Sequence, residues 1–157
     1  DLRDTFQLDQ LFDIALHPDF ASNGYVYFTY MKTAAPPDGA NYYATTALAR
    51  GRFDGERLAD LEDVFVANAW STLRGGDASS IVFAPDGHIF MNASHRRTPE
   101  PPQDLGSHIG KVLRLTDEGV RYTIDRLGRS VEAVHAEPDP TAKPARSSSS
   151  TTASPST

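Results

Sequence analysis

The sequence contains no cysteine, which excludes a disulfide framework and any thiolate chemistry. No apolar run approaches the roughly 20 residues that a membrane-spanning helix needs. Acidic residues outnumber basic ones by 21 to 15, and this argues against a nucleic-acid partner, because phosphate binding needs clustered Lys and Arg. No Walker loop, Rossmann fingerprint, zinc-ligand spacing or nucleophile elbow is present either.

What the sequence does contain is one pattern that occurs twice, about 64 residues apart. Each copy has an apolar strand, a Pro-Asp turn, a glycine and a second strand that carries an aromatic residue. The turn prolines Pro18 and Pro85 are offset by 67 (85 − 18). A further hairpin follows each copy, in which Arg50 and Arg114 are offset by 64 (114 − 50). Repeats of this length built from four short strands are typical of β-propeller blades.

Two groups of four strands are predicted, at residues 11–17, 24–30, 45–53 and 61–67, then at 80–84, 88–93, 110–116 and 120–124. The run at 25–30 is β-branched and aromatic, as on a pleated, half-buried surface. No convincing helix lies between the strands, and this favours antiparallel blades over a βαβ architecture. The sequence therefore predicts an all-β fold: a partial β-propeller of about two four-stranded antiparallel blades.

The predicted organisation is a lead-in segment at residues 1–10, a first blade at 11–67, a second blade at 68–136 with a Pro-rich loop at 94–109, and a tail at 137–157. The tail is rich in Pro, Ser and Thr and has no aromatic residue. Such a segment cannot bury enough apolar surface to offset the entropy of ordering, so we expect it to be disordered.

Residues 11–30 resemble the opening blade motif of the glucose/sorbosone dehydrogenase family. These are soluble quinoproteins, also called PQQ-dependent aldose sugar dehydrogenases. Four further stretches are similar to later motifs and follow in the family's order, at residues 45–52, 63–70, 81–87 and 103–115. The resemblance covers roughly residues 8–119.

This resemblance implies a six-bladed propeller with pyrroloquinoline quinone (PQQ) and calcium near the central axis. A histidine would act as general base on the C1 hydroxyl of an aldose while a hydride passes to the quinone. Calcium, which takes six to eight oxygen ligands, would polarise the quinone carbonyl. The resemblance also implies a periplasmic or secreted protein, although no signal peptide is visible in this sequence.

The sequence departs from the family at the residues that would carry the chemistry. Counting back from Ile81 places the family's catalytic histidine on Gly76 and a nearby arginine on Ser80. Glycine has no side chain to accept a proton. Asp77 is the titratable residue of the stretch 75–80. It could serve as a weak base, or it could be an ordinary aspartate of a loop.

A second departure follows the second strand of the second group. There the family carries Ile-Gly-Asp-x-Gly, and this chain has Ala-Ser-His-Arg-Arg at 93–97. His95 is a candidate for a displaced base, and Arg96 is a candidate for binding a carboxylate of the cofactor. Because both lie beside the Pro-rich loop, solvated surface residues are the alternative. No metal ligand is predicted in this chain.

The remaining candidates are expected to be structural. His17 lies in a Pro-Asp turn that it would cap or pack, and His108 is expected to form structural hydrogen bonds. Asp13, Asp19 and Asp86 are turn or strand-end residues whose side chains can accept from local backbone N–H groups. The sequon at Asn92 lies at a strand end and is a weak signal for glycosylation.

Two functions are compatible with the sequence. The first is a fragment or divergent member of a PQQ-dependent aldose sugar dehydrogenase, inactive as this chain alone. The second is a non-catalytic β-propeller module that binds a partner. Two blades leave apolar faces that neighbouring blades would cover, so self-association through these faces is a further expectation.

Overall fold

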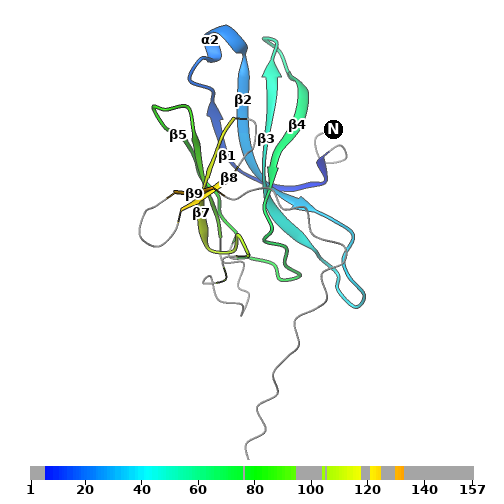
Figure 1. Ribbon diagram of the computed structural model, residues 1–157. Coiled ribbons are helices and arrows are strands. Elements are labelled where there is room, and N and C mark those ends of the chain that lie inside the picture. Colours follow the sequence, from blue (N-terminus) through cyan, green and yellow to red (C-terminus); the bar gives the residue numbers. More distant parts are fainter. Residues whose placement is uncertain are drawn as a thin grey trace, which may run out of the picture.

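The computed structural model describes residues 6–75, 77–94, 104, 106–117, 121–124 and 130–132. They form two antiparallel sheets that pack against each other, with one short helix at the edge of the first sheet (Figure 1). The predicted all-β fold is confirmed. Within the described residues there is no helix long and apolar enough to cross a membrane.

The first sheet has the order β1-β2-β3-β4 and is formed by β1 (Leu8–Leu16), β2 (Tyr25–Thr33), β3 (Ala44–Phe53) and β4 (Leu58–Val66). The central strands β2 and β3 are buried along most of their length, which explains their apolar and aromatic residues. β1 begins at Leu8, inside the range that the sequence suggested as a lead-in. The turn between β3 and β4 contains Gly55, whose φ of 105° agrees with the predicted Asp-Gly turn.

The second sheet has the order β5-β6-β7-β8-β9 and is formed by β5 (Ile81–Phe83), β6 (Ile89–Ala93), β7 (Lys111–Leu115), β8 (Arg121–Ile124) and β9 (Ser130–Glu132). The first four strands correspond to the four predicted. β9 is an additional strand that pairs with β8. It has three residues, too few to show an alternating pattern.

A four-residue helix, α2 (Phe20–Asn23), occupies the turn between β1 and β2. It ends at Gly24, whose φ of 69° is left-handed and whose N–H donates to the carbonyl of Phe20. Asp19 caps the helix through its backbone carbonyl, which accepts from the backbone N–H of Ser22. The sequence analysis expected its side chain to accept from a local N–H, but that side chain makes no capping hydrogen bond. The helix accounts for the unequal offsets of the repeat, because the second copy has a tight turn here.

The main core lies between the two sheets. Its buried residues come from both: Tyr27, Leu48, Phe65, Ala67 and Ala69 on one side and Ile81, Ile89, Met91, Ala93, Ile109, Leu113 and Leu115 on the other. We call this the inter-sheet core. A smaller cluster on the opposite face of the first sheet is closed by Phe6, whose ring packs edge-on against Phe28 and Tyr30. The predicted disordered tail lies outside the described residues.

Candidate functional site

Three connecting segments meet at one end of the two sheets, which is their lower end in Figure 1. They are residues 34–43 between β2 and β3, residues 67–80 between β4 and β5, and the described part of 94–110 between β6 and β7. Antiparallel pairing brings them together, because alternate connections of such a sheet leave from the same end. We call this the connection end. Of the positions that the sequence analysis assigned to chemistry, it contains Asp77.

Backbone and side-chain hydrogen bonds hold the three segments together. Ala44 and Ser71 exchange two backbone hydrogen bonds of 3.0 and 2.9 Å. The backbone N–H of Asn68 donates to Nδ1 of His108 at 2.6 Å, and the N–H of His108 donates to the Asn68 carbonyl at 3.0 Å. The buried His108 ring also lies 5.4 Å from that of Phe65. His108 is thus a structural hydrogen-bonding residue, as predicted.

Asp77 lies in the connection between the sheets and is half-buried. One of its carboxylate oxygens, Oδ2, accepts a hydrogen bond of 3.1 Å from the backbone N–H of Gly75. The carboxylate therefore closes a turn of its own loop. Gly76, His95 and Arg96 lie outside the described residues, so the roles assigned to them stay predictions.

The residues that follow Asp77 are fixed onto the second sheet by Asn92. Its side-chain oxygen accepts from the N–H of Ser80 at 2.7 Å, and its amide donates to the carbonyl of Ala78 at 3.2 Å. Because both the oxygen and the amide nitrogen of its side chain are hydrogen-bonded, Asn92 holds this loop against the sheet. This role argues against glycosylation of Asn92. Next to it, the carbonyl of Ser79 accepts from Oγ1 of Thr29 at 3.3 Å, and the buried Ser79 hydroxyl has no hydrogen-bond partner within the described residues.

A cation at the connection end was not anticipated from the sequence. The guanidinium of Arg74 lies over the ring of Tyr42 at 3.9 Å and 3.6 Å from a carboxylate oxygen of Asp9. The Tyr42 hydroxyl donates to the same carboxylate at 3.0 Å. Tyr42 and Arg74 border an open pocket of about 400 Å³, whose other lining residues are Gly39, Ala40, Asn41 and Thr72. Positions 9, 42 and 74 are too far apart in sequence for a short motif to relate them.

The other histidine singled out, His17, lies at the opposite end of the first sheet. Its Nδ1 accepts from the backbone N–H of Asp19 at 3.0 Å and from the side-chain amide of Asn23 at 2.8 Å. The ring also packs against those of Tyr27 and Phe83. His17 therefore caps and packs its turn, as predicted.

The described residues alone do not form a site that fits PQQ and calcium. No three His, Cys, Asp or Glu side chains gather among them in a way that could hold a metal ion. Calcium needs several oxygen ligands in one place, and an anionic quinone needs cations aimed at its carboxylates. At the connection end, the Arg74 guanidinium is directed to Asp9 and Tyr42.

The fold defines the class of protein: the two sheets are blades of a partial β-propeller, packed as neighbours around an axis that runs along their inner strands β1 and β5. A family model described as Glucose / Sorbosone dehydrogenase matches residues 8–125. The chain belongs to this family.

Two curated relatives show the extent of the similarity. An uncharacterized protein of Synechocystis sp. (strain ATCC 27184 / PCC 6803 / Kazusa) is 34% identical over 121 residues, which are 69% of this chain and 27% of the relative. The aldose sugar dehydrogenase YliI of Escherichia coli (strain K12) is 29% identical over 111 residues, which are 69% of this chain and 29% of the relative. The chain thus spans less than a third of the length of either protein.

Among solved structures, the PQQ-bound aldose sugar dehydrogenase of Streptomyces coelicolor is 26% identical, with a TM-score of 0.53 over 69% of this chain and 30% of that one. The match again covers about two blades of a larger propeller. It supports the resemblance that the sequence motifs indicated.

Proposed function

We propose that this chain forms two blades of a propeller of the PQQ-dependent aldose sugar dehydrogenase type, and that it does not oxidise sugars by itself. The position of the family's catalytic histidine carries the proposal, since the count back from Ile81 places Gly76 there. In that chemistry a base removes the proton of the sugar C1 hydroxyl, and PQQ, when bound, accepts the hydride from C1. A glycine cannot act as the base.

The neighbouring groups at the connection end support the same proposal. Asp77 is the nearest described carboxylate, and its Oδ2 accepts from the N–H of Gly75. We assign it a structural role in the loop. The candidates His95 and Arg96 remain proposals for a displaced base and a carboxylate-binding cation. Family membership further supports an aldose as the substrate class of the whole propeller and a periplasmic or secreted location.

The decisive test is reconstitution of the purified chain with PQQ and Ca²⁺, followed by dye reduction with a panel of aldoses. We expect no turnover above a control without PQQ. Cofactor-dependent turnover that is abolished by His95→Ala or by Asp77→Asn would overturn the proposal and name the base. An aldose sugar dehydrogenase with a histidine at this position serves as the positive control for the assay.

Binding is tested separately from chemistry through the single tryptophan, Trp70, whose ring stacks on Tyr43 at the connection end with centroids 4.9 Å apart. Titration with PQQ and Ca²⁺ is expected to give no saturable change in its fluorescence. Free N-acetyltryptophanamide, titrated in parallel, corrects for absorption by the quinone. Saturable quenching would show that cofactor binding has survived the loss of the base.

The second candidate function is a non-catalytic propeller module that binds a partner. It is favoured by the large apolar side chains exposed on both sheets, among them Leu11, Ile14, Val82 and Val112. Reconstitution of this chain alone gives no turnover under either candidate. The candidates differ when further blades and a histidine at position 76 are supplied, because only the first then predicts turnover.

A further inference from the structure

His108 joins two of the three segments at the connection end through a reciprocal pair of hydrogen bonds. Its Nδ1 accepts from the backbone N–H of Asn68 at 2.6 Å, and its own backbone N–H donates to the carbonyl of Asn68 at 3.0 Å. Nδ2 of Asn68 also donates to the carbonyl of Gly106 at 3.0 Å, and the Asn68 carbonyl accepts from Oγ of Ser107 at 3.4 Å. All four hydrogen bonds meet at Asn68, and we call them the Asn68–His108 contact.

The contact fixes the protonation state of the His108 ring. A backbone N–H can only donate, so the nitrogen that accepts from it carries no proton, and the neutral ring has its proton on Nε2. His108 is 5% exposed, and its ring centroid lies 5.4 Å from that of Phe65. Burial of this kind also disfavours a charged imidazolium. A proton on Nδ1 would set two N–H groups against each other at Asn68, and the hydrogen bond would be lost.

The charged side chains of the described segments around His108 are Glu62 and Asp63 on β4, Arg74 and Asp77 in the connection of Asn68, and Asp104 and Lys111 on either side of His108. The two β4 carboxylates are paired with Arg50 and Lys32 at 2.6 and 2.7 Å, and Arg74 lies 3.6 Å from Asp9. Asp77 and Asp104 accept from backbone N–H groups of their own loops at 3.1 and 2.8 Å, and Lys111 donates to two carbonyls. The charge change that bears directly on the Asn68 N–H is therefore that of the His108 ring itself.

We propose that the Asn68–His108 contact is a pH-sensitive switch, closed while His108 is neutral and opened when its ring takes up a proton. Opening separates residues 106–108 from the connection between the sheets. That connection leads from Asn68 to Gly76, where the sequence analysis places the family's catalytic histidine. In acid, this end of the molecule loses the hydrogen bonds that fix the path of the connection. The switch consists of described residues alone and does not depend on whether the chain binds PQQ.

The direction of the pH dependence follows from the charge of the closed state. The closed contact holds a neutral ring, whereas an opened and solvated histidine titrates at about pH 6.5. The stability of the contact is therefore fully present above this pH and is lost as the pH falls below it. Because opening takes up one proton, the equilibrium constant for opening rises about tenfold per pH unit in this range. Ordinary carboxylates titrate at about pH 4, so the range from pH 7.5 to pH 5 isolates the histidine.

Nuclear magnetic resonance of the wild-type chain tests the proposal directly. At pH 7.5, the nitrogen chemical shifts of His108 are expected to show an unprotonated Nδ1 and a proton on Nε2. Between pH 6.5 and pH 5, the protection factor of the Asn68 amide against hydrogen exchange is expected to fall about tenfold per pH unit. A protection factor that stays constant over this range, or a protonated Nδ1 at pH 7.5, would overturn the proposal. These spectra carry the test even if a variant fails to fold.

Two variants separate the acceptor of His108 from its titration. His108→Asn keeps an acceptor, Oδ1, at the same place along the side chain, and since this group does not titrate, the protection of the Asn68 amide should no longer depend on pH. His108→Leu has no acceptor and is expected to give low protection at every pH.

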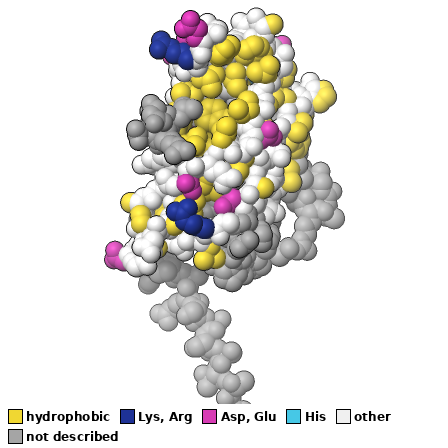
Figure 2. Space-filling model, turned by 180° about the vertical axis from the view of Figure 1, so that it is seen from behind, with side chains coloured by type: hydrophobic (Ala, Val, Ile, Leu, Met, Phe, Trp, Pro, Cys, Tyr) yellow, Lys and Arg dark blue, Asp and Glu magenta, His cyan; other side chains and the backbone are white. Residues whose placement is uncertain are grey.

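His17→Asn is the matched control, because the Nδ1 of His17 also accepts from a backbone N–H but only within its own turn. This variant is expected to keep the wild-type pH dependence at Asn68. One face of the molecule is broadly hydrophobic (Figure 2), so the spectra are recorded at two protein concentrations to separate association from opening of the contact. A pH dependence at Asn68 that persists in His108→Asn, or that disappears in His17→Asn, would assign the titration to another group and contradict the proposal.

Discussion

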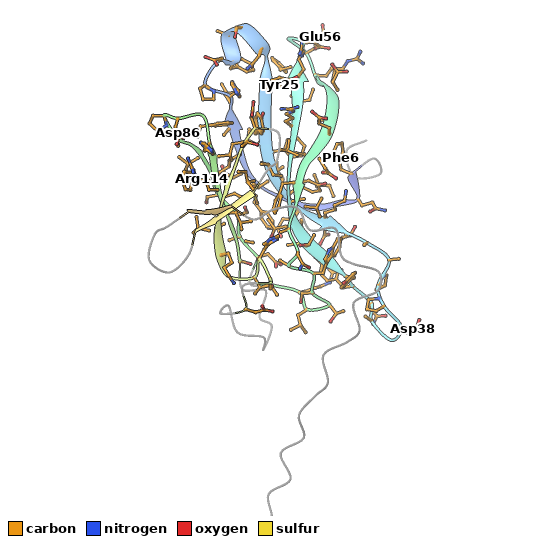
Figure 3. The ribbon with its side chains drawn as sticks, viewed as in Figure 1. Phe6, Tyr25, Asp38, Glu56, Asp86 and Arg114 are labelled. Atoms are coloured by element: carbon orange, nitrogen blue, oxygen red, sulfur yellow. The ribbon has the colours of Figure 1, made fainter. Side chains whose placement is uncertain are left out.

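Asp86 shows how a single turn residue of the second sheet is tied to its neighbours. Its Oδ1 accepts from the backbone N–H of His88 at 3.1 Å, and its Oδ2 accepts from the Arg114 guanidinium at 2.8 Å. Figure 3 shows the two labelled side chains, Asp86 and Arg114, close together. The hydrogen bond from His88 and then that from Arg114 hold the pKa of Asp86 below its usual value. The role predicted from the sequence, acceptance from a local N–H, is confirmed.

A pH dependence of stability follows from this lowered pKa. The ionised Asp86 stabilises the fold above its unfolded pKa of 3.8, and the contribution is lost as the pH falls from there through the lower folded pKa. Asp86→Asn is therefore expected to be less stable at neutral pH and to lose less stability than the wild type in acid. Urea midpoints at pH 7, 5 and 3 measure this. Asp38→Asn, in an exposed loop, is the control and should follow the wild-type curve.

Asp13 joins the two sheets by a hydrogen bond that the sequence analysis did not predict. Its Oδ1 accepts from the adjacent N–H of Ile14 at 2.9 Å, as expected of a strand residue, but its Oδ2 accepts from the N–H of Ile81 at 3.0 Å. That bond joins β1 to β5. Asp13→Ala leaves the N–H of the buried Ile81 without its acceptor, which costs about 1–3 kcal/mol.

The expected result for Asp13→Ala is a lower free energy of unfolding in urea, with Asp38→Ala unchanged. Asp13→Asn retains an acceptor oxygen and should recover part of the loss. If Asp13→Ala were as stable as the wild type, the bond between the inner strands would not contribute to the packing of the two sheets.

At the scale of elements, the pairing of β3 with β4 depends on Gly51. The register between these strands shifts between Arg50 and Arg52, the two residues that flank Gly51. An added Cβ at Gly51 would lie 2.7 Å from Cδ2 of Leu61 and 3.1 Å from the carbonyl oxygen of Ala59. Because Gly51 has no side chain, the side chain of Leu61 in β4 can pack directly against the backbone of β3.

We expect Gly51→Ala to destabilise the first sheet by about 1–3 kcal/mol through overpacking. The closest contact is a side-chain atom, so the same change made in a Leu61→Ala background should cost less. A double-mutant cycle of urea unfolding energies measures the difference. Equal costs in both backgrounds would show that the carbonyl of Ala59, rather than Leu61, limits the space.

The elements that the sequence predicted are those with strong local patterns. The aromatic run at 25–30 and the Asp54-Gly55 turn indicated β2 and the β3–β4 hairpin because each carries its signal within a few residues. β9 was not predicted, since three residues show no period. The cluster of Asp9, Tyr42 and Arg74 was not predicted either, because the register that brings these residues together is a property of the folded sheet.

For the whole molecule, too, local sequence patterns could be predicted from and contacts between distant residues could not, and this decides how much of the candidate site was predicted. The order of the motifs identified the family and predicted that Gly76 occupies the position of the catalytic histidine. Both inferences need only a comparison of short sequence motifs. It did not reveal that Asp77 accepts from Gly75 or that Asn92 holds the connection by hydrogen bonds, because those contacts depend on how the loop folds over the second sheet.

Both sheets contribute to one inter-sheet core, so the molecule is expected to unfold as one unit.

Leu48→Ala tests this cooperativity. Leu48 is fully buried among residues of both sheets, so its truncation leaves a cavity at their contact and should cost about 2–5 kcal/mol. Trp70 fluorescence reports on the connection between the sheets, and far-UV circular dichroism reports on all strands. Both signals are expected to shift to the same lower urea midpoint, at one fixed protein concentration so that association does not change the comparison. Two separate midpoints would mean that one blade unfolds while the other stays folded, and that the inter-sheet core does not couple them.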